Sequence, residues 1–453
     1  MASLLIDTLL RVLEARQPHA EGSERPTIHD VILELLYRND CRIRERVTTT
    51  TETQAVHLLG VRGYGERPLW LVSSILGGAR HLASAPRYDE TTGRVHGAGT
   101  VSGCADLVVK ILAAARVPAH ELKRPVCIAA LEGLESQRDA ALDLVDVSAT
   151  GAGVALVGAA TGLALWTEHP GALTLKVSVE REARHRRMPP MLDFYDVTVE
   201  GRGAHYLTPG DSMNAIERAC ALLDELRERG SARLLAIDAG EGADRIATQA
   251  RMTLATGYPL DALPQWASAR PLPDGSSVPF PIDELYGKWR LACAAGLERL
   301  GLPQAEGTAH IGRLVSLLNR LEGLVTLPTD LESDPEEITG RFAEATRAAL
   351  GEQGQLELQV SALDDRPSLD ANAHTPEWLE EVQGSLRVLG LPDQGLRGSV
   401  TSDAGMLQKA GVPAVVLGPG RSSDMFTADE SVSLTELERA LEFYESMIRR
   451  WCT

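Results

Sequence analysis

The chain has 453 residues, of which 44% are hydrophobic and 24% charged, a composition typical of a globular protein with two or three domains. Its formal net charge of -18 at pH 7 disfavours nucleic acid as a partner, because phosphate binding requires a basic surface. No apolar run reaches the roughly 20 residues of a membrane-spanning helix, and the first residues predict an amphipathic helix rather than a signal peptide, so we expect a cytoplasmic protein without membrane contacts.

The first part of the chain alternates strands with helices. After an N-terminal helical region, apolar runs at residues 55–63 and 68–76 predict strands, and residues 104–117 have apolar side chains at helical spacing. Residues 123–131 and 154–162 predict two more strands. This alternation indicates an α/β fold with a mostly parallel sheet and helices on both of its faces.

A different pattern begins near residue 175. Residues 175–180 and 194–201 alternate apolar and polar side chains, as half-buried antiparallel strands do. The elements predicted after them are helices at 212–230 and 335–350 and strands at 233–239, 323–332 and 355–363. This part of the chain therefore predicts an inserted α+β domain.

The α/β pattern returns from about residue 364, with helices at 375–390 and 433–451 and a strand at 413–420. We therefore expect an α/β domain of the catalytic type, residues 1–174 and 364–453, interrupted by a lid or dimerisation domain, residues 175–363. Within the insert, residues 257–306 form an unusually long connection, rich in Pro and Gly at first and then helical. It is either a peripheral helix of the lid or an elaboration that binds substrate or a partner.

Three short sequences in different parts of the chain occur together in one known family. Residues 201–219, GRGAHYLTPGDSMNAIERA, contain Gly, His205, Pro and Asn-Ala-Ile at a characteristic spacing. Asn319 and Asp330 are eleven residues apart, and residues 401–420 read TSDAGMLQKAGVPAVVLGPG. From about residue 60 onward the chain resembles the family of dizinc hydrolases that includes aminoacylase, carboxypeptidase G and succinyl-diaminopimelate desuccinylase. The resemblance implies a zinc-exopeptidase-like fold and a homodimer formed through the lid.

The resemblance also indicates where zinc ligands would lie. The residues at these positions are Ser74 and Leu76 in place of His-x-Asp, Ser102 in place of a bridging aspartate, Gly133 and Ala159 in place of carboxylates, and Phe426 in place of the last histidine. Zinc binds imidazole, thiolate or carboxylate ligands at about 2.0–2.3 Å, and a catalytic site normally has three of them. The sequence therefore predicts a divergent member without the dizinc centre and without another cofactor. Cys104 and Asp106, close to the bridging position, are the alternative ligands for a relocated metal.

Other residues of the family's site are retained. By resemblance, Glu132 stands for the general base, His205 for a lid histidine that helps bind an oxyanion in the neighbouring subunit, and Asn319 for a lid asparagine that holds the substrate. Each also has a structural interpretation: a carboxylate in a solvated turn, a structural histidine and an amide that caps a turn.

One substitution changes the charge expected of the ligand. Glu332 replaces an arginine that grips the substrate carboxylate in the family, and a glutamate there would favour an amine or another cation. Alternatively, Glu332 only belongs to the acidic run before a helix N-terminus. We expect Asp403, Gly418 and Gly420 to line the cleft.

These observations favour a metal-independent enzyme that acts on a small amino-acid-derived, peptidyl or carrier-bound substrate, with Glu132 as the base and His205 as a second catalytic residue. Without a Lewis acid the hydrolysis of an amide is disfavoured, so we expect cyclisation, elimination or acyl transfer, by analogy in specialised-metabolite biosynthesis. Two alternatives stay open: an inactive homologue that binds a partner, and a conventional zinc amidohydrolase whose ligands lie elsewhere in the sequence.

Overall fold

The computed structural model describes most of the chain. The described residues are 2–17, 26–49, 54–75, 85–132, 153–181, 192–207, 210–243, 245–273, 281–302, 309–330, 332–351, 356–374, 376–427 and 429–453. The chain divides into two compact units, the first of residues 1–171 and 366–453 and the second of residues 172–365. Among the helices of the described ranges, none combines the length and apolar character needed to cross a membrane.

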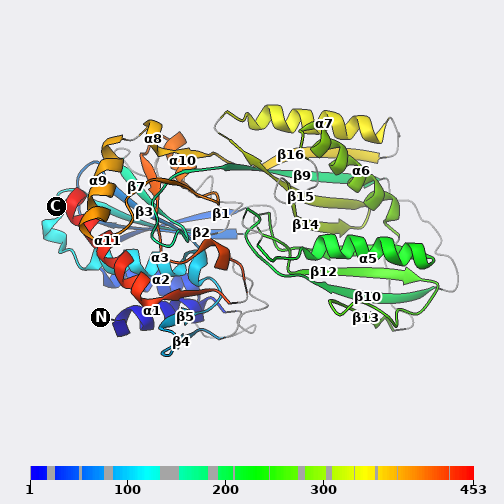
Figure 1. Ribbon diagram of the computed structural model, residues 1–453, viewed down its shortest axis with the longest axis horizontal. Helices are drawn as coiled ribbons and strands as arrows, with labels where there is room; N and C mark the ends of the chain where they lie inside the picture. Colours follow the sequence, from blue (N-terminus) through cyan, green and yellow to red (C-terminus); the bar gives the residue numbers. More distant parts are fainter. Residues whose placement is uncertain are drawn as a thin grey trace. The chain divides into compact units, whose positions relative to one another are not determined.

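A nine-stranded sheet forms the centre of the first unit (Figure 1). Its four central strands, in the order β6 (Val126–Glu132), β3 (Leu69–Ile75), β7 (Val154–Gly158) and β19 (Ala414–Val416), are parallel. They are continuous apolar runs and almost completely buried, as expected for strands covered on both faces. The predicted α/β fold with a largely parallel sheet is thus confirmed.

Shorter or more polar strands extend this sheet at its edges. They are β1 (Arg42–Thr49), β2 (Gln54–Arg62), β8 (Trp166–His169), β17 (Leu369–Asp370) and β18 (Leu396–Arg397). A separate three-stranded sheet consists of β4 (Arg87–Asp89), β5 (Arg94–His96) and β20 (Ser431–Ser433). Most of the edge pairings are antiparallel, so the sheet is mixed.

Helices cover both faces of the nine-stranded sheet. On one face, α3 (Ala105–Ala115) contacts β3 and β6 and packs along α11 (Leu434–Cys452), and α1 (Ala2–Ala15) contacts α2 (Ile28–Arg38) and α3 (Figure 1). Successive side chains of a strand point to opposite faces: Ser73 hydrogen bonds to α3, and Ser74 bonds to Asp403 at the start of α10. The helix α10 (Ala404–Lys409) contacts β7 and β19. Two further helices are α8 (Ala371–His374) and α9 (Pro376–Val388), and α9 packs on α11.

The second unit is built on an eight-stranded sheet. Its order is β13 (Ala267–Pro271), β10 (Asp193–Glu200), β12 (Gln249–Thr256), β11 (Ala232–Ala239), β14 (His310–Leu317), β15 (Arg320–Thr329), β9 (Gly171–Arg181) and β16 (Leu356–Arg366). The pairings from β13 to β15 are antiparallel. The helices among the described residues of this unit are α5 (Ala215–Arg229), α6 (Asp283–Arg299) and α7 (Pro335–Leu350).

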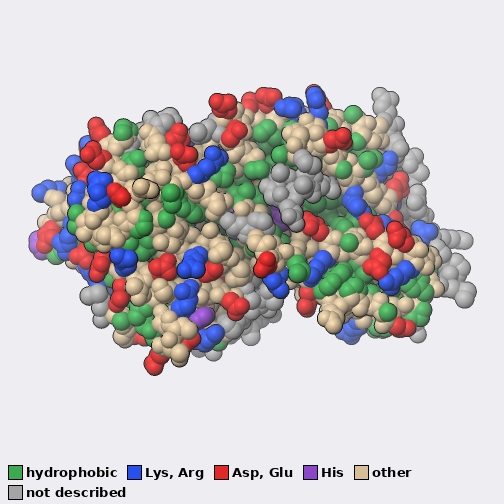
Figure 2. All heavy atoms as spheres, in the orientation of Figure 1, with side chains coloured by type: hydrophobic (Ala, Val, Ile, Leu, Met, Phe, Trp, Pro, Cys, Tyr) green, Lys and Arg blue, Asp and Glu red, His purple; other side chains and the backbone are tan. Residues whose placement is uncertain are grey.

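The helix α6 lies within the segment 257–306 that the sequence left open. It buries Leu285, Tyr286 and Trp289 in the hydrophobic core of the second unit, and the indole N–H of Trp289 donates to the carbonyl oxygen of Val177 at 2.9 Å. It therefore belongs to the core rather than to the periphery; residues 274–280 and 303–306 lie outside the described residues. On the face shown in Figure 2, acidic and basic side chains are interspersed over the surface.

Candidate functional site

A small pocket of the first unit lies at the carboxyl ends of β3 and β7. It is lined by Ser74, Val101, Ser102, Gly103, Asp106, Gly158, Ala159, Arg366, Val400, Thr401, Ser402, Asp403 and Met425. The carboxyl edge of a parallel sheet is the usual place of a ligand site in α/β proteins. The space open to the centres of water-sized molecules is about 30 Å³, enough for roughly two waters or one small polar group.

Three positions at which the resemblance expects zinc ligands meet in this pocket. Ser74 lies near the end of β3, Ser102 lies in the short helix Thr100–Cys104 before α3, and Ala159 follows β7. Leu76 and Gly133 lie outside the described residues. Phe426 follows the lining residue Met425 and is itself buried, with 1% of its surface exposed.

The hydroxyl of Ser102 is held by a buried glutamate. It donates to Oε1 of Glu430 at 2.8 Å, and the backbone N–H of Phe426 donates to the same oxygen at 2.9 Å. The N–H groups of Gly99 and Val101 donate to Oε2 at 2.9 and 3.3 Å. Burial raises the pKa of Glu430, while the hydrogen bond from Ser102 acts in the opposite direction. Glu430 thus joins residues 99–102 to Phe426 by hydrogen bonds, and the positive charge of Arg16 lowers its pKa as well.

Phe426 has an unusual backbone conformation, with a φ of 61°. A phenylalanine in this left-handed region costs roughly 1–2 kcal/mol, whereas histidine, asparagine and aspartate are several-fold enriched there. The hydrogen bond to Glu430 holds this backbone in place. The conformation therefore suits the histidine that the resemblance expects at this position better than it suits phenylalanine.

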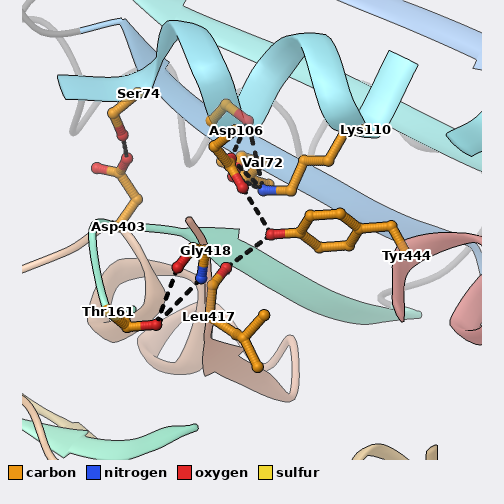
Figure 3. A network of polar contacts seen from close by, with 10 residues as sticks. Val72, Ser74, Asp106, Lys110, Thr161, Asp403, Leu417, Gly418 and Tyr444 are labelled. Carbon is orange, nitrogen blue, oxygen red and sulfur yellow. Dashed lines mark hydrogen bonds and ion pairs between the residues drawn. The ribbon is translucent and has the colours of Figure 1, made fainter. Parts of the chain in front are cut away.

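A buried ion pair includes Asp106 of the pocket lining (Figure 3). The Lys110 ammonium is 2.7 Å from Oδ2 of Asp106 and donates to the carbonyl oxygen of Val72 at 2.6 Å. The hydroxyl of Tyr444 lies 2.6 Å from Oδ1 of Asp106. Burial lowers the pKa of Lys110, and Asp106 acts in the opposite direction. The carboxylate of Asp106 is thus already paired with a cation, the Lys110 ammonium, so Asp106 is poorly suited as a ligand of a relocated metal.

The other candidate for a relocated metal, Cys104, is also engaged. Its thiol sulfur accepts a hydrogen bond from the Arg16 guanidinium at 3.3 Å, and burial raises the pKa of this thiol. A neutral thiol is a poor metal ligand, because zinc binds the thiolate.

Asp403 lines the pocket and accepts a short hydrogen bond from the hydroxyl of Ser74 (Figure 3). Gly418 and Gly420 are not among the described lining residues. A Cβ atom at Gly418 would lie 2.4 Å from the carbonyl oxygen of Ala159, and one at Gly420 would lie 2.4 Å from the side chain of Val101. The two glycines therefore permit close packing behind the pocket wall.

The donor set of this pocket does not fit zinc. Ser74 and Ser102 present hydroxyls that donate to carboxylates, and Ala159 presents a methyl group. Across the described ranges, no group of three or more His, Cys, Asp and Glu side chains is arranged to hold a metal ion. The described residues of the pocket therefore do not provide the zinc ligands on which the chemistry of the dizinc family depends.

Glu132 lies at the end of β6 but not in the lining of the pocket. Its register partner in β3 is Ile75, so it shares the face of Ile75 and not that of Ser74. One carboxylate oxygen accepts the N–H of Val56 at 2.9 Å and lies 3.0 Å from Nε2 of His29. The hydrogen bond to Glu132 raises the pKa of His29, partly offset by burial. The structure thus pairs Glu132 with His29, on the side of α2.

His205 belongs to the second unit and is buried, with 3% of its surface exposed. Its Nδ1 accepts the N–H of Leu207 at 3.2 Å, so the remaining proton of a neutral ring lies on Nε2. Its ring stacks on Tyr206 with 5.1 Å between centroids. These contacts fix the orientation of the imidazole.

Asn319 and Glu332 also belong to the second unit. Asn319 lies in the turn between β14 and β15, and its amide nitrogen donates to the carbonyl oxygen of Arg181 at 2.8 Å and to Oε1 of Glu180 at 3.2 Å. Both amide hydrogens are thus used within the fold. Glu332 is exposed in the turn before α7, and its N–H donates to Oδ1 of Asp330 at 3.1 Å.

One serine of the pocket contacts a buried histidine that the sequence did not single out. Oγ of Ser402 is 2.9 Å from Nε2 of His169, and Nδ1 of His169 is 2.9 Å from the carbonyl oxygen of Pro170. Burial lowers the pKa of His169 to about 4. The two side chains are 233 positions apart in the chain and no motif links them, so only the fold reveals the pair.

Comparisons with known proteins agree with this architecture. Residues 79–450 match the model of peptidase family M20/M25/M40. The comparison with curated protein sequences finds no match.

Among solved structures, human carnosine dipeptidase 1 is 11% identical over 100% of this chain and 99% of its own, with a TM-score of 0.56. The dipeptidase Dug1p of Saccharomyces cerevisiae is 12% identical, covering 99% and 95%, with a TM-score of 0.57. A tripeptidase of Staphylococcus aureus is 14% identical, covering 99% and 98%, with a TM-score of 0.54. Likeness at these identities shows a shared fold, and the family match extends over most of the sequence. The chain belongs to peptidase family M20/M25/M40.

Proposed function

We propose that this chain is a metal-independent enzyme on an M20 scaffold, which binds the reacting group of an amino-acid-derived or peptidyl substrate at the pocket at the carboxyl ends of β3 and β7 and transfers its acyl group. The observation that carries the proposal is the lining itself. Three positions expected to hold ligands meet there as Ser74, Ser102 and Ala159, beside polar groups that suit a small ligand.

The charges of the lining support an amino-acid-derived ligand. Asp403 and Arg366 both line the pocket, so its wall contains a carboxylate and a guanidinium, groups whose charges are complementary to an ammonium and to a carboxylate. Three serines, Ser74, Ser102 and Ser402, line the same pocket, and their hydroxyls are neutral donors and acceptors. A pocket of this kind orients a small zwitterionic group by a few convergent polar contacts.

Acyl transfer agrees with the pocket better than the other reactions considered. Hydrolysis of an unactivated amide would need a Lewis acid or a metal-activated hydroxide, and the described residues contain no group of ligands for such a metal ion. Cyclisation or elimination with Glu132 as base would need that carboxylate beside the ligand. Glu132 is instead paired with His29 and is not among the described lining residues. The pocket has hydroxyl nucleophiles of its own, which is what acyl transfer requires.

Metal content provides the first test. Protein purified without chelators should contain far less than one zinc per chain by inductively coupled plasma mass spectrometry. About two zinc ions per chain would return the protein to the conventional dizinc mechanism.

Ligand binding provides the second test, with a panel of amino-acid amides, N-acyl amino acids and dipeptides followed by ligand-observed NMR. Ala159→Leu fills the pocket and should weaken binding at least about 10-fold, since a small pocket tolerates little added volume. Ala348→Leu, on an exposed position of α7, is the matched control and should bind as the wild type does. Equal binding by Ala159→Leu would refute the pocket as the site. Binding without any covalent change of the ligand would favour the alternative of an inactive homologue.

A further inference from the structure

We propose that Ser402 is the nucleophile of this acyl transfer and that His169 is the base that activates it. The inference rests on the proposed function and deepens it, because it names the reacting atom of the same pocket. The class of substrate is an activated acyl compound, such as a thioester or an ester of an amino acid or a peptide.

The hydrogen bonds of His169 determine which of its nitrogens carries the proton. Nδ1 lies 2.9 Å from the carbonyl oxygen of Pro170, and a carbonyl oxygen only accepts, so Nδ1 carries the hydrogen. In a neutral ring Nε2 is then the acceptor. Nε2 is 2.9 Å from Oγ of Ser402, so the serine hydroxyl donates to it. The Ser402 hydroxyl is thus hydrogen bonded to the imidazole that would act as its base, and the carbonyl of Pro170 orients this imidazole, as nucleophilic catalysis requires.

Burial keeps the base neutral and places it behind the nucleophile. His169 has 2% of its surface exposed, and burial together with the Arg366 guanidinium lowers its pKa to about 4, against the hydrogen bond to Pro170. Ser402 lines the pocket. A ligand therefore meets the serine hydroxyl first, and at neutral pH the imidazole is in the form that can accept a proton.

The other two lining serines have different partners. Ser74 donates to the Asp403 carboxylate and Ser102 to the Glu430 carboxylate. Of the lining serines in the described part of the chain, Ser402 is the one bonded to an imidazole. The backbone N–H of Ala404 also points at Oγ of Ser402, at 3.2 Å, and this hydrogen bond stabilises negative charge that develops on the oxygen.

The reaction balances without a further reagent. As Oγ of Ser402 bonds to the carbonyl carbon, its proton moves to Nε2 of His169. The bond from that carbon to the leaving group then breaks, and the leaving group takes the proton from Nε2, which leaves an acyl-serine. In the second half, water or an amine loses a proton to Nε2 and attacks the acyl carbon. The bond from Oγ to carbon breaks, and Ser402 regains its proton.

The low basicity of His169 restricts the substrate. A buried imidazole next to a guanidinium binds a proton weakly, so His169 activates the serine only weakly. A weakly activated nucleophile reacts with an acyl carbon that is itself reactive and carries a good leaving group. Thioesters and activated esters satisfy this condition, and ordinary amides do not.

The test is covalent labelling of the full chain with an alkyl fluorophosphonate, followed by intact mass and peptide mass spectrometry. The serine oxygen displaces fluoride, so an activated serine acquires a stable phosphonyl group. The wild type should be labelled on Ser402, and Ser402→Ala should not be labelled. His169→Asn should label about 100-fold more slowly, the usual loss of a general base. Ser399→Ala is the matched control, because Ser399 is exposed, contacts Ser422 and is not among the described lining residues.

The pH profile of labelling tests the base even if His169→Asn fails to fold. The wild-type rate should stay level from neutral pH down to about pH 5 and fall only as His169 gains a proton near its pKa of about 4. A fall near pH 6.5, the ordinary value for histidine, would overturn His169 as the base.

The remaining outcomes separate this inference from the proposed function. An unlabelled Ser402 in a protein whose pocket binds its ligand overturns the nucleophile and leaves the pocket standing. A labelled Ser402 in a protein whose pocket binds no member of the panel supports the nucleophile and removes the proposed substrate class.

Discussion

Ser102 and Glu430 form a hydrogen bond of 2.8 Å in which a hydroxyl stands where the resemblance expects a carboxylate. Glu430 is almost fully buried, and burial raises its pKa. A second carboxylate at position 102 would face this glutamate without a metal ion between them. The serine therefore removes a like-charge contact that zinc binding would otherwise have to offset.

Ser102→Asp should accordingly destabilise the protein by about 2–3 kcal/mol near pH 8, because Arg16, the cation that acts on Glu430, would then face two buried carboxylates. The deficit should shrink toward about pH 5, since acid allows one of the carboxylates to hold a proton. Thermal unfolding at both pH values measures the effect. Ser102→Asn is the neutral control of similar size, and an equal loss of stability with both substitutions would contradict the electrostatic explanation.

The buried ion pair of Lys110 and Asp106 leads to a second prediction about the free energy of unfolding. Lys110→Met removes the cation and should cost about 3–5 kcal/mol, because Asp106 is left as a buried charge. The double substitution Asp106→Asn with Lys110→Met should recover most of this loss, since neither partner is then charged. Urea unfolding measures the free energy of unfolding of the two variants and the wild type. A double variant as unstable as Lys110→Met would show that lost packing, and not an unpaired charge, causes the destabilisation.

Glu132→Gln separates a catalytic role from a structural one. As the base of the reaction, Glu132 would be worth about two to four orders of magnitude in rate. Its carboxylate lies on the side of α2 with His29. We therefore expect the rate of acyl transfer by Glu132→Gln to stay within about 3-fold of the wild-type rate, a change too small for the loss of a general base. A larger loss of rate would restore Glu132 as the base.

The same substitution should change how stability depends on pH. Glu132 raises the pKa of His29 in the folded protein, so the pair stabilises the fold fully below the unfolded value of about 6.5 and this contribution disappears as pH rises through the raised value. Both side chains are about a quarter exposed, so the contribution is at most about 1 kcal/mol. Glu132→Gln should abolish this part of the pH profile, which thermal unfolding between about pH 5 and 9 would show.

The fold could be predicted from the sequence wherever the apolar pattern was strong. The buried runs of β3, β6 and β7 and the helical spacing of α3 and α11 predicted an α/β sheet, and α7 occupies the predicted residues 335–350. The strands β12 and β14 were not predicted. In β12 the buried Ala250, Met252 and Leu254 alternate with polar side chains, a pattern that the prediction missed, whereas β14 buries His310 and Gly312, which do not form an apolar pattern. Their pairing with β11 and β15 completes the sheet, and that information lies outside the strands themselves.

The candidate site could be predicted only in part. The motif comparison selected Ser74, Ser102, Ala159 and Asp403, which the fold brings to one pocket. It could not place Glu132, because the direction of a side chain at the end of a strand depends on its register with the neighbouring strand. The contact of Ser402 with His169 joins the strand β8 to the loop before α10, and neither residue belongs to a local pattern that indicates its partner.

The last prediction concerns Gly158, where the backbone of β7 passes directly beside the buried ion pair of Asp106 and Lys110. A Cβ atom at this position would lie 1.7 Å from Oδ2 of Asp106, the atom bonded to Lys110. Gly158→Ala should therefore displace the carboxylate and destabilise the protein by about 3 kcal/mol, in the range of a broken buried ion pair. Gly340→Ala, in α7 with no atom within 4 Å of the added carbon, is the matched control and should be stabilising by about 0.5–1 kcal/mol. Combining Gly158→Ala with Asp106→Ala and Lys110→Met should cost little beyond those last two substitutions, since neither the ion pair nor the carboxylate atoms that the added carbon meets remain. If Gly158→Ala is as harmless as the control in urea unfolding, the carboxylate does not lie against β7.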